Sequence, residues 1–311
     1  MTPRRASAVS VRDLRKRYGA LDAVDGISFD AREGEVYALL GHNGAGKSTT
    51  VEILEGHRDR SAGEVSVLGL DPARAGRELR DRIGIVLQSS GIEPELTVRE
   101  AIELYGSAYR RRRGVDELVG MVGLEEKVDD RIGSLSGGQQ RRIDLALGIV
   151  GTPELLFLDE PTTGFDPAAR RKSWGLVEQL CSDGTTVLLT THYLDEAEHL
   201  ADRVGVLVSG VLVAEGTPDE LIGGVAATVV TFTLPAGVTG TDLDGVLPDQ
   251  ARVSGTQVEF SSSTPTAHVH AVTAWALERG IELDALTVSR PSLEDVYLEL
   301  SDRGVPSGEP T

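Results

Sequence analysis

A glycine-rich loop between a predicted strand and a predicted helix constrains this chain more than any other feature. The loop occupies residues 41–48 and reads Gly-His-Asn-Gly-Ala-Gly-Lys-Ser. The apolar run 35–40 precedes it and the helix-compatible segment 49–54 follows it, which is the strand, loop and helix order of a phosphate-binding loop. The sequence therefore predicts an α/β fold that holds a nucleotide phosphate at this loop.

The residue types of the loop suit contact with phosphate. Glycines let the backbone curl so that successive N–H groups point at phosphate oxygens, and the helix N terminus adds partial positive charge. Lys47 supplies a full charge to the β and γ phosphates, and the Ser48 hydroxyl suits Mg²⁺. The chain has only four lysines among 31 basic residues, so a lysine here is informative. The expected nucleotide contacts are Gly41, Asn43, Gly44, Gly46, Lys47, Ser48 and Thr49.

A second glycine pair lies in the segment Leu135–Gln139, which reads Leu-Ser-Gly-Gly-Gln. Ser136 and the amides of Gly137 and Gly138 are expected to cap a helix over 139–147 and can face an anion. A helix cap alone is the simpler interpretation. One phosphate-recognition element is enough to bind a nucleotide. Two such elements in one chain imply a nucleotide that is shared between them.

Polar side chains follow three further apolar runs: Asp159 and Glu160 after 155–158, Gln88 after 85–87, and His192 after 186–191. Ligands of open α/β sheets bind at the carboxyl edge, so we expect all four side chains there. Asp159 is predicted to face Mg²⁺ through water, and Glu160 to act as general base toward the attacking water. Gln88 can contact Mg²⁺ or water, and His192 can contact the γ-phosphate or orient the water.

Two residues outside these runs are also candidates. Tyr18 precedes the glycine-rich loop and offers a ring on which adenine can stack, although a lone tyrosine is more often a packing residue. Asp166 precedes Pro167 after the acidic pair, where an aspartate commonly serves a turn but could reach across a dimer.

These residues, in this order, resemble the ATP-binding cassette (ABC) family over residues 9–216. Tyr18 matches its adenine-stacking aromatic, 41–48 its Walker A motif, Gln88 its coupling glutamine, Leu135–Gln139 its signature, Asp159–Glu160 its Walker B pair, Asp166 its D-loop aspartate and His192 its switch histidine. The one departure is Phe165, where many members carry leucine. The resemblance implies a P-loop NTPase cassette with a mostly parallel sheet, an antiparallel β subdomain and a helical subdomain.

The resemblance also implies a mechanism and partners. In this family two cassettes pack head to tail, so the signature of one chain, here Ser136, Gly137, Gly138 and Gln139, closes over ATP and Mg²⁺ held by the other. The segments 142–146, 191–198 and 291–297 resemble the drug- and antibiotic-exporting branch of the daunorubicin-resistance type. The implied function is an ATPase that powers export of a small molecule through a separate transmembrane permease.

The pattern along the chain predicts two domains: a cassette over 1–224, with its helical subdomain at about 89–150, and a small α+β domain over 225–311. Strands are expected over 227–234, 257–260 and 286–288, and helices over 268–277 and from a capping box at Thr97 and Glu100. A metal pair at His268 and His270 is disfavoured, because their spacing puts them on different helix faces.

Composition narrows the choice of partners. The formal charge of −18 argues against a sequence-independent nucleic-acid partner, and the arginine run 110–113 is interpreted as a solvated helix end rather than a lipid-facing patch. No run of eighteen apolar residues and no export signal are present. We therefore expect a cytoplasmic protein, peripheral on the cytoplasmic face of the membrane. The alternatives are a soluble ABC ATPase acting on ribosomes or nucleic acid, and a small-molecule kinase, which would leave the signature and His192 unexplained.

Overall fold

The computed structural model describes residues 6–87, 91–225, 228–235, 237–243, 245–248, 250–289 and 292–304. The chain divides into two compact units, Met1–Pro218 and Asp219–Thr311. The sequence prediction places the boundary after residue 224, within the helix that spans this division.

The first unit is built on a six-stranded sheet with the order β5-β6-β7-β3-β8-β9. Its strands are β3 (Val36–Leu40), β5 (Ile83–Val86), β6 (Leu155–Asp159), β7 (Thr186–Thr191), β8 (Arg203–Val208) and β9 (Val211–Gly216). All neighbours pair in parallel except β8 and β9. The central strands are buried along almost their whole length, as expected for a parallel sheet covered on both faces. The predicted mostly parallel sheet is confirmed.

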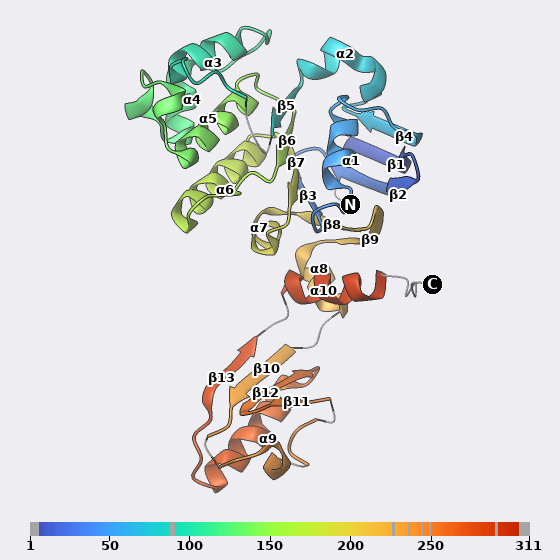
Figure 1. The fold of residues 1–311 in the computed structure, drawn as a ribbon, viewed down its shortest axis with the longest axis vertical. Helices are drawn as coiled ribbons and strands as arrows, with labels where there is room; N and C mark the ends of the chain where they lie inside the picture. The colour runs from blue at the N-terminus through green and yellow to red at the C-terminus, as the bar shows by residue number, and fades with distance from the viewer. Residues whose placement is uncertain are drawn as a thin grey trace. The chain divides into compact units, whose positions relative to one another are not determined.

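A three-stranded antiparallel sheet, ordered β2-β1-β4, lies beside the helix that follows the glycine-rich loop (Figure 1). Its strands are β1 (Ser7–Tyr18), β2 (Leu21–Arg32) and β4 (Ala62–Val67), and the adjoining helices are α1 (Lys47–Leu54) and α2 (Pro72–Arg80). Val9 and Leu14 of β1 are fully buried in one hydrophobic core with Leu39 of β3 and Phe157 of β6. This shared core fixes the antiparallel sheet against the parallel one.

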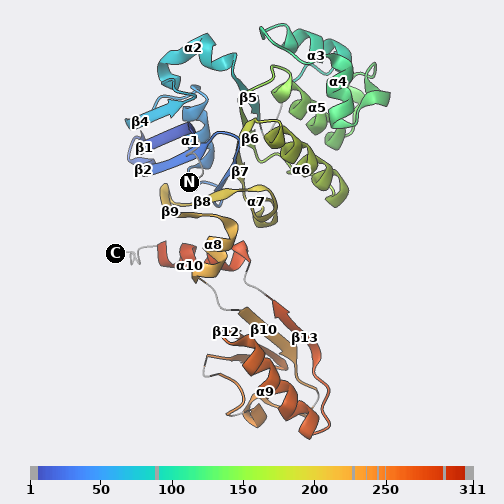
Figure 2. The same cartoon turned by 180° about the vertical axis from the view of Figure 1, so that it is seen from behind.

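The helices between β5 and β6 form a cluster of their own, drawn in green in Figures 1 and 2. They are α3 (Val98–Gly106), α4 (Val115–Val122), η1 (Glu125–Lys127), η2 (Ile132–Ser134) and α5 (Gly137–Ile149). The predicted capping box at α3 is confirmed, since the Thr97 side chain accepts from the Glu100 amide and the Glu100 carboxylate accepts from the Thr97 amide. Two more helices, α6 (Pro167–Ser182) and α7 (Leu194–Leu200), pack against β7, and α7 also contacts β3.

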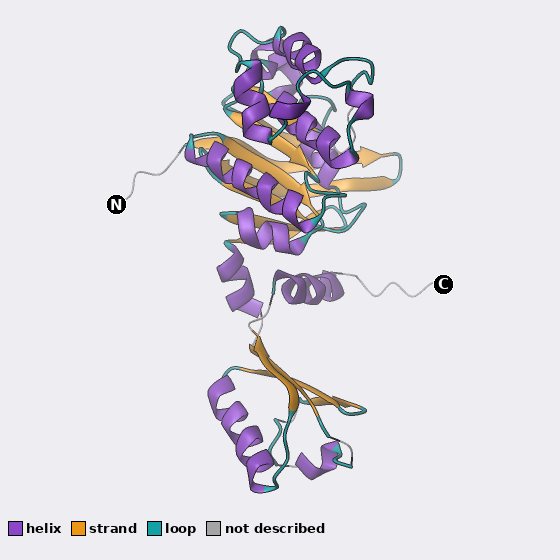
Figure 3. Ribbon diagram, turned by 90° about the vertical axis from the view of Figure 1, so that its left-hand side faces the viewer, coloured by secondary structure: helices purple, strands orange, loops and turns teal. Residues whose placement is uncertain are grey.

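The second unit contains a four-stranded antiparallel sheet with the order β11-β12-β10-β13. Its elements are α8 (Pro218–Val225), β10 (Thr228–Thr233), η3 (Gly240–Leu243), β11 (Arg252–Ser254), β12 (Gln257–Ser262), α9 (Pro265–Glu278), β13 (Asp284–Ser289) and α10 (Leu293–Gly304). Alternate residues of β10 and β12, including Phe232 and Phe260, are buried with Val272 and Trp275 of α9 on one face of the sheet (Figure 3). Helices α8 and α10 and strand β11 were not predicted from the sequence.

Candidate functional site

The sheet order brings the chemically important residues of the sequence to one edge. Strands β6, β7 and β3 are neighbours, and their registers pair Asp159 with Thr190 and Leu40 with Thr191. The glycine-rich loop leaves β3, the acidic pair closes β6, and His192 follows β7. The expectation that these groups share the carboxyl edge of the sheet is confirmed for the residues that the structure describes.

The glycine-rich loop adopts a backbone that other residues would strain. Gly44 has φ 87° and Gly46 has φ 104°, a region that residues with a Cβ rarely adopt. A Cβ on Gly46 would lie 2.4 Å from the carbonyl oxygen of Ala23, and one on Gly41 would lie 2.5 Å from that of Leu207. The loop therefore packs closely against the segments of Ala23 and Leu207, and α1 begins within its last two residues, at Lys47.

The polar groups of the loop are presented at its outer side. Asn43, Gly44 and Ser48 are exposed, and Thr49 is half-buried. No side chain caps the N terminus of α1, whose N-cap residue is Gly46. The first N–H groups of a helix lack partners within the helix, so this terminus suits an anionic group.

Lys47 is buried beneath the loop. Its ammonium donates to the carbonyl oxygens of Gly41 at 2.6 Å and of His42 at 3.2 Å. Burial lowers the pKa of Lys47, while the carboxylates of Glu160 and Asp159 act in the opposite direction. The ammonium thus lies between the loop and the acidic pair, where it can meet phosphate oxygens.

The two carboxylates at the end of β6 have different partners. The Asp159 carboxylate accepts a hydrogen bond from the Thr190 hydroxyl. Glu160 has the left-handed φ of 47°, and its amide donates to the carbonyl oxygen of Thr190 at 3.0 Å. Its Oε1 lies 2.9 Å from Nδ1 of His192, and its Oε2 accepts from the Thr163 hydroxyl at 3.4 Å. The predicted base and the predicted switch histidine are therefore in direct contact.

The segment Leu135–Gln139 forms the predicted helix cap. The Ser136 side chain accepts from the Gln139 amide at 3.4 Å, and the Gln139 side chain accepts from the Ser136 amide at 2.8 Å. Among the residues that the structure describes, a Cβ on Gly137 or Gly138 would meet no heavy atom within 4 Å. The N terminus of α5 is therefore open toward its surroundings, as an anion-facing cap requires.

The remaining predicted site residues are Tyr18, Asp166 and Gln88. Tyr18 ends β1 with 38% of its surface exposed, and Lys16 and Arg58 lie 5.1 and 5.4 Å from its ring centroid. Asp166 is exposed and caps α6 by accepting from the amides of Ala168 and Ala169. Those bonds lower the pKa of Asp166. Gln88 falls outside the described residues.

The structure adds Arg141 and Thr190 to the site, which sequence reasoning missed. Arg141 lies on α5 and donates to the carbonyl oxygens of Asp159 at 2.9 Å and Glu160 at 3.1 Å. Thr190 is fully buried and contacts both acidic residues. The sequence carries no signal for Arg141, because its acceptors are main-chain carbonyl oxygens and the next residue is also an arginine.

A buried acid lies at the other end of α1. The Glu55 carboxylate is 2% exposed and lies 3.2 Å from Nδ1 of His57. Burial, reinforced by the charges of Asp159 and Glu52, raises the pKa of Glu55 to about 8. Glu55 is therefore mostly neutral at pH 7.

Oxygen donors suited to Mg²⁺ are present near the loop. The Ser48 hydroxyl and the Asp159 carboxylate are hard ligands of the type that Mg²⁺ prefers. Among the described residues, no three His, Cys, Asp or Glu side chains gather in a way that could hold a metal ion. In general, Mg²⁺ takes few protein ligands and completes its shell with water and phosphate oxygens.

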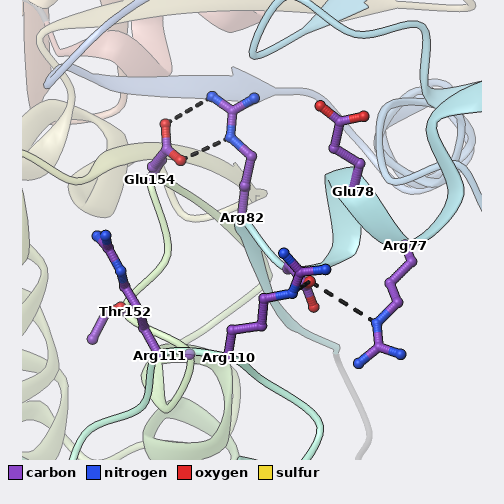
Figure 4. A pocket seen from close by; sticks show the side chains of 9 residues that line it. Arg77, Glu78, Arg82, Arg110, Arg111, Thr152 and Glu154 are labelled. Carbon is purple, nitrogen blue, oxygen red and sulfur yellow. Dashed lines mark hydrogen bonds and ion pairs between the residues drawn. The ribbon is translucent and has the colours of Figure 1, made fainter.

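The cavity shown in Figure 4 lies elsewhere, at the amino ends of β5 and β6. It encloses about 690 Å³ and is lined by Arg77, Glu78, Asp81, Arg82, Arg110, Arg111, Gly151, Thr152 and Glu154. Arg82 forms two bonds with Glu154, at 2.7 and 2.8 Å, and Arg110 lies 3.4 Å from Asp81. These ion pairs neutralise much of the arginine charge, in keeping with a solvated surface rather than an anion site.

The described helices include none with the length and apolar character needed to cross a bilayer.

Comparisons with known proteins match both units. The family described as ABC transporter matches residues 24–163, and the family described as ABC transporter domain-containing protein-like, C-terminal domain, matches residues 228–292. The daunorubicin resistance ATP-binding protein DrrA2 of Streptomyces coeruleorubidus is 38% identical, covering 94% of this chain and 95% of that protein. The Nod factor export ATP-binding protein I of Paraburkholderia xenovorans is 38% identical, covering 96% and 98%. A solved dimeric bacterial ABC transporter cassette has a TM-score of 0.61 and 28% identity, covering 67% of this chain and 98% of that one.

Proposed function

The chain belongs to the ABC transporter family, and on that premise we propose that it powers export of a small molecule through a separate permease. It is an ATP-binding subunit that hydrolyses ATP. The observation that carries the proposal is the convergence of loop 41–48, the acidic pair 159–160 and His192 at one sheet edge. That arrangement offers a phosphate cradle, a base and an orienting group in one place.

We assign the chemical steps to the residues of this edge. The loop amides and Lys47 hold the β and γ phosphates, because they supply N–H groups and a positive charge. Glu160 accepts the proton of the attacking water at its carboxylate, an effect worth about 10²–10⁴-fold in rate. His192 holds that carboxylate through its 2.9 Å contact and faces the γ-phosphate.

Mg²⁺ would be held by the Ser48 hydroxyl, by Asp159 through water and by Gln88. When bound, it offsets negative charge on the β and γ phosphates. The hydrogen bond from the Thr190 hydroxyl fixes the orientation of the Asp159 carboxylate, which would help it to hold the ion.

We further propose that two copies of the chain pack head to tail. The open N terminus of α5, with Ser136 and Gly137 exposed, would close over the triphosphate held by the loop of the second copy. A solved cassette that is similar to this chain is described as dimeric, which supports the pairing of two copies here. A single chain would then hold only part of each site.

The names of the relatives support the proposed class of substrate and location. One relative is described as a daunorubicin resistance protein and another as a Nod factor export protein, and this chain spans nearly the full length of both. By analogy the chain binds the cytoplasmic face of the membrane beside a permease encoded as a separate protein. The domain 225–311 is proposed to serve this assembly.

A pull-down from detergent-solubilised membranes tests this proposal. The tagged full-length chain should recover a multi-span membrane protein, and vesicles containing the recovered pair should move a substrate only when ATP is hydrolysed. Membranes incubated with the untagged chain serve as the control. Recovery of ribosomal or nucleic-acid material instead of a membrane protein would contradict the proposal.

A further inference from the structure

The guanidinium of Arg141 bonds to the backbone of two segments that are distant in sequence. Each of its three nitrogens donates to a main-chain carbonyl oxygen: Nε to Pro161 at 3.0 Å, Nη1 to Leu87, and Nη2 to Asp159 at 2.9 Å and Glu160 at 3.1 Å. Nη1 also lies 3.7 Å from the carboxylate of Asp144 on the same helix. The planar fork of arginine has five N–H donors, and few other side chains could reach so many acceptors.

These hydrogen bonds surround the positive charge of Arg141, which is buried. Arg141 and Asp144 are each 8% exposed, and burying a charge is costly unless it is paired and hydrogen-bonded. Burial lowers the pKa of Arg141, and the nearby charges of Asp144 and Asp159 oppose that shift. The charged, fully bonded side chain therefore fixes its neighbours in a specific geometry.

The backbone that Arg141 binds is the backbone that aims the catalytic carboxylate. Glu160 has a φ of 47°, a strained conformation that persists only where the surroundings hold it. Its amide is held by Thr190 and its carbonyl oxygen by Arg141. The same guanidinium holds Leu87, the last described residue before Gln88.

We propose that Arg141 is a positioning residue for ATP hydrolysis, which fixes the backbone of Glu160 and Leu87 relative to α5. Because Ser136 caps the N terminus of α5, a second chain that docks on this helix end would act on the catalytic carboxylate through Arg141. The inference rests on the proposed roles of Glu160 and Ser136.

Arg142, the next residue, provides a matched control. It lies on the same helix and also donates to two carbonyl oxygens, those of Val122 at 3.3 Å and Gly123 at 2.7 Å. These close the end of α4, not the acidic pair. Arg142→Lys therefore removes the same kind of hydrogen bond from guanidinium to carbonyl oxygen, but at the end of α4 instead of at the acidic pair.

The first test compares ATP hydrolysis by full-length Arg141→Lys and Arg142→Lys. Lysine keeps the charge but has a single ammonium, which cannot bond all four carbonyl oxygens. We expect kcat to fall about 10- to 100-fold in Arg141→Lys with KM for ATP within about threefold, since misplacement of about 1 Å costs this much. A kcat close to wild type in Arg141→Lys, or an equal loss in Arg142→Lys, would overturn the proposal.

The second test measures amide hydrogen exchange in the full-length chain and does not depend on activity. Arg141→Lys should speed exchange in both 83–87 and 159–163, whereas Arg142→Lys should speed it only near 120–124. If Arg141→Lys does not fold, Asp144→Asn replaces it, because the loss of that carboxylate loosens Nη1 and should give a smaller change in the same two segments. Unchanged exchange there contradicts the proposal, even if Glu160 proves not to be the base.

Discussion

At the scale of single residues, the neighbours of Glu160 control different properties of its carboxylate. The carbonyl oxygen of Thr190 and the guanidinium of Arg141 hold its strained backbone, whereas Nδ1 of His192 holds one carboxylate oxygen. A base must lie within hydrogen-bond reach of the proton that it takes. The backbone contacts therefore set where the carboxylate lies, and His192 sets how it points.

Glu160→Gln should bind ATP but hydrolyse it about 10²–10⁴-fold more slowly, because an amide cannot accept the proton of the water. The measurement is steady-state ATPase activity together with equilibrium binding of a fluorescent ATP analogue. Glu198→Gln, an exposed change on α7, is the control and should retain wild-type activity. Near-normal turnover by Glu160→Gln would show that another group is the base.

Glu55 should make stability depend on pH. The folded state raises its pKa from 4.5 to about 8, so the stability from the neutral carboxyl is complete below pH 4.5 and is lost as the pH rises through 8. Since one pKa unit corresponds to about 1.4 kcal/mol, the free energy of unfolding should fall by a few kcal/mol over this range. Denaturant unfolding at about pH 5 and about pH 8.5 should show this fall in wild type and in the Glu198→Gln control, which changes an exposed carboxylate on α7. An equally large fall in Glu55→Gln would contradict the assignment.

The candidate site was predictable where local sequence carries the chemistry. Asp159, Glu160 and His192 each terminate an apolar run, and the sheet topology brought them together as expected. Arg141 was not predictable in this way. Its acceptors lie 54 residues before it and up to 20 residues after it along the chain, and main-chain carbonyls leave no pattern in the sequence.

At the scale of elements, the fit of the glycine-rich loop against β2 determines how α1 begins. Gly46→Ala should destabilise the chain by roughly 1–3 kcal/mol from backbone strain alone, with a further cost from the 2.4 Å approach to Ala23. Gly175→Ala is the control, since Gly175 lies within α6 with open space around it. That change should raise stability by about 0.5–1 kcal/mol. Thermal unfolding of both variants measures these changes in stability. A Gly46→Ala chain with wild-type stability would mean that the loop does not pack against Ala23 as described.

Elements were predictable where periodicity or capping is strong. The buried strands β3, β6 and β7, the capping box of α3 and helix α9 all follow such patterns. Strand β11 has three exposed residues, so it lacks the alternation that marks a strand. It exists because β12 pairs with it, and such pairing is a tertiary effect. The sequence also did not predict helix α2, because Gly76, which is non-helical in the structure, interrupts its helical pattern.

At the scale of the whole molecule, charge and relatives favour transport over action on nucleic acid. The chain carries a formal charge of −18, and its densest arginine cluster is partly paired, with Arg110 beside Asp81 and Arg113 beside Glu117. A nucleic-acid partner needs a basic surface to displace counterions. The absence of a nucleic-acid partner remains a prediction, and the relatives with the names of export systems agree with it.

A shared site makes two defective chains complementary. In Lys47→Ala the phosphate loop is defective and the signature intact. In Gly137→Asp the reverse holds, because a carboxylate at the N terminus of α5 favours the helix but repels phosphate. Position 137 has open space around it, so the folded chain accommodates the change. In the proposed head-to-tail pair, one copy of each variant would together form one intact site and one doubly defective site.

The most direct measurement is therefore the ATPase rate of an equal mixture of Lys47→Ala and Gly137→Asp chains. Each variant alone should be nearly inactive. Random pairing places one intact site in half of the dimers, so the mixture should recover up to about a quarter of the wild-type rate per chain. A mixture no more active than its two components, or a Gly137→Asp chain that hydrolyses ATP normally by itself, would contradict a site shared between two copies.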